Sequence, residues 1–373
     1  MNFTALSFVR NRVQVGTPLP FNVRNADRTL LLARGQRVES AAQLESLFAR
    51  GALVDLAEVV PAAEAVDRLP REQLPRRWNA CLDRMAQALQ HAPHDEFRTA
   101  LDEAATPVVA LIERDPDLAI FQVLRNEGGS AAEYGVRRSL DSAIAAYLVA
   151  QRLGWDADSM HKGFKVALTM NVAMLELQGV LARQRTAPTP TQLQALRSHP
   201  QRSREVLELA GITDTDWLQA VEDHHEVEGG GGYPRGLSAV SDLASLARRA
   251  DIYTAKLAAR SHRDALAADV AGRQMFMQDP GHPMTAALVK EFGIYPPGCA
   301  VRLASGATGI VVGRGEQMTA PVVACLTDAD GTALPAPERR DTALPQHRVV
   351  AVIGERSINV RVTAEKLMAL AGR

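Results

Sequence analysis

The run HHEVEGGGGYPRGL at residues 224–237 constrains this chain more than any other feature. The apolar spacing before it predicts a helix over residues 217–228 that carries two adjacent histidines, His224 and His225, near its end. Four glycines then break the helix, and glycine lets backbone approach a ligand closely. Two interpretations stay open: a metal or phosphate site, or a helix end with one hydrogen-bonded and one solvated histidine.

Composition restricts the class of protein around this motif. The chain has 373 residues, 46% of them hydrophobic and 23% charged, with a net charge of -1. A nearly neutral chain has no overall field to attract nucleic acid or an anionic membrane, so neither partner is expected. Its three cysteines lie far apart, which indicates a reducing compartment and no disulfide framework. Without a signal-like N-terminus or a long apolar run, we expect a cytoplasmic protein that does not insert into a membrane.

The periodicity predicts a mainly α protein with four regions. Residues 1–60 read as a small α/β module with short strands near 8–9, 12–15 and 30–32, and residues 61–130 as a linker and helical region with a corner at 128–129. Residues 131–290 form a helical bundle, in which the apolar segment 164–181 is expected to be a buried central helix. Residues 291–373 are a β-rich extension, with strands expected near 299–312, 322–326, 348–353 and 359–362.

The order HHExxxGxGYPxGL resembles the signature of the HD-GYP family, bacterial metal-dependent phosphodiesterases that hydrolyse cyclic di-GMP. The resemblance covers residues 131–312, and it implies an HD-type helical bundle whose metal ligands come from several helices. It assigns a ligand histidine to His199, the histidine pair to His224 and His225, and the last aspartate to Asp251. The family's basic pair, which faces ligand phosphates, corresponds to Arg260 and Arg263.

Three family ligands are replaced here. Arg138 stands where the family has a histidine, and Met170 and Asn171 stand where it has the His-Asp pair. A neutral amide is a poor bridge between two divalent cations, and a thioether is a soft ligand. Arg138 places a permanent positive charge where one metal would lie. We therefore expect no two-metal catalytic site, and we expect Arg138 to pair with Asp251 within about 6 Å.

The histidines that remain could hold one metal. His199, His224 and His225 together supply three imidazoles, which suit a single zinc, iron or manganese ion. The alternative is that they are remnants without a metal, bonded to one another or to Glu226. The resemblance further implies ligand contacts from the loop residues Gly230, Gly232, Tyr233 and Pro234 and from the basic pair.

Two functions compete at this stage, beside a third possibility, a purely structural protein whose retained motif only stabilises the bundle. The first is a catalytically degenerate protein of bacterial cyclic di-GMP signalling, a pseudoenzyme that binds cyclic di-GMP or a protein partner. The resemblance associates the GYP loop with diguanylate cyclase domains, which makes such a domain the candidate partner. The second is a divergent cyclic di-GMP phosphodiesterase that uses one metal on the three histidines.

Overall fold

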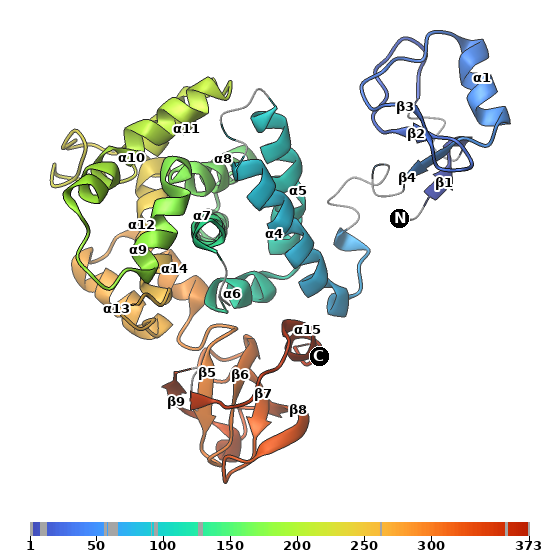
Figure 1. Cartoon of the computed structure of the whole chain (residues 1–373). Helices are drawn as coiled ribbons and strands as arrows, with labels where there is room; N and C mark the ends of the chain where they lie inside the picture. The colour runs from blue at the N-terminus through green and yellow to red at the C-terminus, as the bar shows by residue number, and fades with distance from the viewer. Residues whose placement is uncertain are drawn as a thin grey trace. The chain divides into compact units, whose positions relative to one another are not determined.

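A computed structural model describes residues 3–7, 13–55, 58, 66–90, 92, 96–125, 130–261, 263–354 and 357–371. The strand expected at 8–9, the beginning of the one at 12–15 and the corner at 128–129 lie outside this part of the chain. The chain divides into two compact units, Met1–Leu69 and Pro70–Arg373. Figure 1 shows the elements of each unit.

The first unit is the small α/β module that the sequence predicts. Its antiparallel sheet has the order β1-β4-β2-β3, and its core contains Phe21, Val23 and Val54. The helix begins after Ser40, whose side chain accepts a hydrogen bond from the Gln43 amide. The elements are β1 (Phe3–Ala5), β2 (Val23–Arg24), β3 (Leu30–Leu32), α1 (Ala41–Ala49) and β4 (Leu53–Asp55).

The second unit is a helical bundle followed by a sheet, so the mainly α prediction is confirmed. The bundle begins with η2 (Arg71–Gln73), α4 (Leu74–Gln90), α5 (Phe97–Arg114), α6 (Pro116–Leu124), α7 (Ala131–Arg152), α8 (Ala157–Thr169), η3 (Val172–Met174) and α9 (Leu175–Arg183). It continues with α10 (Pro190–Leu209), α11 (Thr215–Asp223), α12 (Asp242–Leu257), α13 (Ala268–Gln278) and α14 (Pro283–Phe292).

The central helix is α7, not the segment 164–181. Residues 138–150 of α7 are all buried, and α7 packs against α8, α9, α12 and α14. Figure 1 shows α7 nearly end-on, with the other helices around it. Two glycines let α9 come close, because a Cβ on Gly135 would lie 2.1 Å from the Leu175 oxygen and one on Gly179 would lie 2.0 Å from the Ala131 oxygen.

The segment 164–181 is broken rather than continuous. It contains the end of α8, the 3-10 turn η3 and most of α9. The segment Ala157–Arg183 is long and apolar enough to cross a membrane. Half of its most apolar stretch is buried inside the fold, however, and helices of a protein core can have the same length and composition. The break turns the chain back at Met170 and Asn171, both of which are buried.

The C-terminal part of this unit is a five-stranded antiparallel sheet with the order β8-β7-β6-β5-β9. Val301, Val311 and Val323 form its core, and β6 packs near α6. The strand expected at 359–362 is absent from these described residues, whereas β8 was not expected. The elements are β5 (Ala300–Leu303), β6 (Thr308–Gly313), β7 (Val322–Thr327), β8 (Ala333–Asp341), η4 (Pro345–His347), β9 (Val349–Ile353) and α15 (Ala364–Met368).

Candidate metal and ligand site

His199 is oriented by the proline that follows it. The helix α10 runs through Pro200 without stopping. Proline has no N–H to donate to the carbonyl four residues earlier, which here is that of Leu196. The His199 Nδ1 atom lies 2.6 Å from that oxygen and takes the missing donor's place. The ring is thereby fixed with Nδ1 protonated and Nε2 free.

His224 is oriented in the same way by a helix end. The helix α11 stops at Asp223, earlier than expected, and His224 is its C-cap. The last carbonyls of a helix lack partners within it. His224 Nδ1 lies 2.6 Å from the Val221 oxygen, so this ring also carries its proton on Nδ1.

The two free nitrogens meet in the interior. His199 Nε2 and His224 Nε2 are 3.0 Å apart, and both side chains are buried. Each neutral ring presents a lone pair there, and two acceptors at this distance need a proton or another cation between them. Burial, together with a neighbouring histidine, lowers the pKa of each ring to about 3, so a shared proton is disfavoured at neutral pH.

A divalent metal fits this donor set. One donor nitrogen from each of His199, His224 and His225 lies within 4.8 Å of the others. Nitrogens 3.0 Å apart can both lie about 2.1 Å from one ion. Metal-binding histidines usually donate their second N–H to a carbonyl or carboxylate, as His199 and His224 do here. The arrangement therefore fits a single-metal site better than it fits histidines that remain without a metal.

Beside the histidines, Arg138 of α7 pairs with Asp251 of α12. Arg138 Nη2 lies 3.0 Å from Asp251 Oδ1 and 3.2 Å from the Asp251 carbonyl oxygen. The Arg138 side chain is 4% exposed and that of Asp251 is 19% exposed. The Asp251 carboxylate is close enough to raise the pKa of His199 and of His224 against the larger effect of burial. The Asp251 carboxylate thus lies beside one guanidinium and near the imidazoles of His199 and His224.

The segment that replaces the family's His-Asp pair lies against α10. The Ala173 N–H donates to Ser203 Oγ at 3.3 Å, one turn after His199. Met170 is fully buried, and the Asn171 Oδ1 atom is buried with no hydrogen-bond partner among the described residues. Neither side chain adds a carboxylate or an imidazole to the site.

The glycine loop is held by a buried acid, Glu226. Its carboxylate accepts hydrogen bonds from the backbone N–H groups of Arg235, Gly236 and Leu237, at 2.6, 3.1 and 2.9 Å. Glu226 was expected only as an alternative hydrogen-bond partner of the histidines, but its oxygens bind the loop backbone instead. An acid three residues before Gly229 was the available signal for this role.

Within the loop, Gly232 allows the closest approach. A Cβ there would lie 2.4 Å from Glu226 Cα and 2.6 Å from the His225 oxygen. Tyr233 follows and stacks on His225, with ring centroids 4.6 Å apart and an interplanar angle of 17°. Tyr233 and Pro234 are both exposed, and so is Gly230. The loop thus covers one histidine and presents its tip to solvent.

The basic pair lies in a tight turn after α12. Backbone bonds join Arg260 and Arg263 in both directions, at 2.8 and 3.1 Å. Arg260 is exposed, whereas Arg263 is half-buried and donates through Nη2 to the Ala255 carbonyl. Burial lowers the pKa of Arg263, and the charges of Arg260 and Arg138 lower it further. Arg263 therefore lies near Arg138, on the same side of the molecule as the Arg138–Asp251 pair.

The search against family models finds no match. The cyclic di-GMP phosphodiesterase PA4108 of Pseudomonas aeruginosa is 26% identical over 246 residues. That alignment covers 64% of this chain and 57% of the relative, so the chain spans little more than half of the relative's length.

A solved structure gives the fold. Bd1817, an HDG"Y"P protein from Bdellovibrio bacteriovorus, aligns with a TM-score of 0.50 at 14% identity, covering 78% of this chain and 98% of that chain. The resemblance to the HD-GYP family is confirmed. At 14% identity the structural likeness concerns the HD-GYP fold alone.

Proposed function

We propose that this chain is a catalytically degenerate HD-GYP-like protein of bacterial cyclic di-GMP signalling. It binds a ligand or a protein partner and does not hydrolyse phosphodiesters. The observation that carries the proposal is the buried Arg138–Asp251 ion pair. In the family pattern both positions are metal ligands, and here they neutralise each other.

The charge balance argues against two metals. A second divalent cation beside Arg138 would bring three positive charges together around the single carboxylate of Asp251. Asn171 supplies no charge to offset them, and Met170 supplies a soft sulfur. One cation on the three histidines meets no such obstacle, because neutral imidazoles are its natural ligands.

The ligand proposed for the site is cyclic di-GMP. The similar Pseudomonas protein is named as a cyclic di-GMP phosphodiesterase, and the basic pair Arg260 and Arg263 remains. Guanidinium groups suit phosphate oxygens because they donate two parallel N–H bonds. The exposed loop tip at Tyr233 and Pro234 is the surface proposed for a diguanylate cyclase domain or another signalling protein.

Measuring both the binding and the hydrolysis of cyclic di-GMP distinguishes a binding protein from an enzyme. With added manganese, iron or zinc, the wild-type chain is expected to bind cyclic di-GMP without hydrolysing it. Replacing Arg260 and Arg263 by alanine is expected to weaken binding at least about tenfold, since it removes two phosphate contacts. Arg273→Ala serves as the control, because Arg273 is 75% exposed on α13. Turnover that disappears in His224→Ala would contradict the proposal.

The three histidines favour one alternative, a divergent phosphodiesterase with a single metal. A cation held there would act as a Lewis acid toward a phosphodiester. The combined substitutions Arg138→His, Met170→His and Asn171→Asp distinguish the two functions. If the chain is degenerate, turnover should rise from background only in this variant. If it is a single-metal enzyme, the wild type is already active.

A further inference from the structure

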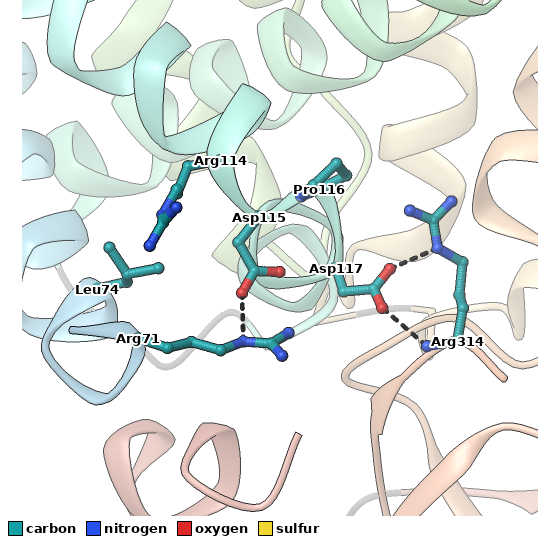
Figure 2. Close-up of a pocket in the computed structure, with 7 residues that line it drawn as sticks. All are labelled: Arg71, Leu74, Arg114, Asp115, Pro116, Asp117 and Arg314. Atoms are coloured by element: carbon teal, nitrogen blue, oxygen red, sulfur yellow. Dashed lines mark hydrogen bonds and ion pairs between the residues drawn. The ribbon is translucent and has the colours of Figure 1, made fainter. Parts of the chain in front are cut away.

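A cleft lies in a part of the molecule whose residues are far from the histidines in the sequence. It has a volume of about 370 Å3 and is lined by Arg71, Leu74, Arg114, Asp115, Pro116, Asp117 and Arg314. Small-molecule sites typically measure roughly 300–1,000 Å3. The walls come from the beginning of α4, the junction of α5 and α6, and the segment after β6 (Figure 2).

Two of its three arginines are held in place by carboxylates. Arg71 Nε lies 2.8 Å from Asp115 Oδ2. Arg314 donates through Nε to Asp117 Oδ1 and through Nη1 to Glu291 Oε1, the latter at 2.9 Å. Figure 2 shows Asp115 and Asp117 side by side, with one arginine on either side. Because these pairs fix the guanidinium planes, a ligand would lose little entropy in ordering them.

Several N–H donors remain unused. Among the described residues, the Nη2 atoms of Arg71 and Arg314 have no hydrogen-bond partner, and the whole Arg114 guanidinium has none. Arg114 is exposed and is the last residue of α5, where the helix dipole favours a positive charge. Glu291 binds Arg152 as well as Arg314, so four guanidinium groups meet three carboxylates around the cleft, and one positive charge is in excess.

We propose that this cleft binds a small phosphorylated molecule. Arg114 supplies the two parallel N–H bonds, and the free Nη2 atoms of Arg71 and Arg314 supply further donors. A phosphate group presents several acceptor oxygens and a negative charge, which match these donors and the surplus charge. The proposal does not depend on what the histidine site binds.

The competing explanation is a set of salt bridges that only attaches the sheet to the bundle. That explanation accounts for Arg71, which joins η2 to the N-cap of α6, and for Arg314, which joins the segment after β6 to α6 and α14. It does not account for Arg114, which lines the cleft without an acidic partner in the described chain. Arg114 is therefore the residue on which the test is based.

The test is calorimetric titration of the full chain with pyrophosphate in low-salt buffer. The wild type is expected to bind it saturably, and Arg114→Ala is expected to lose at least about tenfold in affinity, as for one bidentate phosphate contact. Arg114→Lys, which keeps the charge but not the planar fork, should lie between them. Arg98→Ala is the matched control, an exposed arginine on the same helix, and should change the affinity less than about twofold.

Four results would overturn the proposal, the last of them with acetate. The first is no saturable binding by the wild type, and the second is equal affinity in Arg114→Ala and Arg98→Ala. The third is a loss of pyrophosphate binding in the Arg260→Ala, Arg263→Ala variant instead, which would place the anion at the HD-GYP-like site. Acetate is the probe for carboxylates, and equally tight binding of acetate would refute phosphate specificity. Circular dichroism of each variant confirms that it is folded.

Discussion

Breaking the Arg138–Asp251 pair should destabilise the second unit strongly. Arg138→Met removes the guanidinium and keeps an apolar side chain that can stay buried. It leaves the Asp251 carboxylate, 19% exposed, without its 3.0 Å partner. Removing one member of a buried pair typically costs about 3–5 kcal/mol. Because water still reaches Asp251, we expect a loss at the lower end, about 3 kcal/mol.

A double-mutant cycle isolates the charge interaction. Two unit charges about 4 Å apart attract by about 4 kcal/mol at an effective dielectric constant of 20. Partial exposure reduces this, so we expect a coupling energy of about 2 kcal/mol between Arg138→Met and Asp251→Asn. Asparagine keeps the Asp251 carbonyl, which accepts a second bond from Arg138 at 3.2 Å, so the cycle reports mainly the charge.

The assay is urea unfolding of chelator-treated protein, so that no metal contributes to stability. The control cycle uses Arg204 and Glu208, whose atoms are 2.9 Å apart but whose side chains are 32% and 44% exposed. Such exposed pairs contribute about 0.3–0.5 kcal/mol. A coupling energy no larger than that of this control pair would refute the claim that Arg138 compensates the Asp251 charge.

Three further predictions concern the site's supports. Gly232→Ala should lower the free energy of unfolding by about 1–3 kcal/mol, because the added Cβ would strike backbone. Gly231→Ala is the control, since a Cβ there meets open space, and equal free energies of unfolding for the two variants would refute this prediction. Glu226→Gln should raise amide exchange across residues 235–237, since it weakens three bonds, and unchanged exchange would count against it. Pro200→Ala restores a backbone N–H at residue 200, which would compete with His199 for the Leu196 carbonyl. We therefore expect this variant to resist urea better but to bind zinc about tenfold or more weakly. Unchanged zinc affinity would contradict that reasoning.

Local patterns predicted much of the fold. The first helix begins after a serine cap, Ser40, and ends before Gly51, both common helix-boundary residues, and the histidine pair does precede a glycine loop. The α/β module, the bundle and the β-rich end follow from apolar spacing of two and of three to four residues. The pairing of Arg138 with Asp251 followed from charge, because a buried carboxylate needs a positive partner.

Other features depended on contacts that no local pattern records. The run 164–181 has no proline and is mostly apolar, so only Asn171 itself, a weak helix former, marks the place of the break. The helix α10 continues through Pro200 because His199 satisfies the freed carbonyl. The strand β8 has prolines and charges, which an edge strand tolerates and a propensity argument rejects.

The cleft around Arg114 was also missed. Its arginines come from segments widely separated in the sequence, and each is an ordinary surface residue in its own segment. Only the contact of η2 with the junction of α5 and α6, through Arg71 and Asp115, and the packing of α6 against β6 bring them together. Spacing in the sequence could not have revealed it.

Metal content measured by elemental mass spectrometry is the most direct test of the account. The protein should be purified without chelators and compared with His224→Ala and Arg138→His. We predict one transition metal per wild-type chain, a loss of that metal in His224→Ala, and no second metal unless Arg138 is replaced. Two or more metals in the wild type would contradict the claim that the Arg138 charge occupies the second position. No metal would contradict the interpretation of the facing histidine nitrogens.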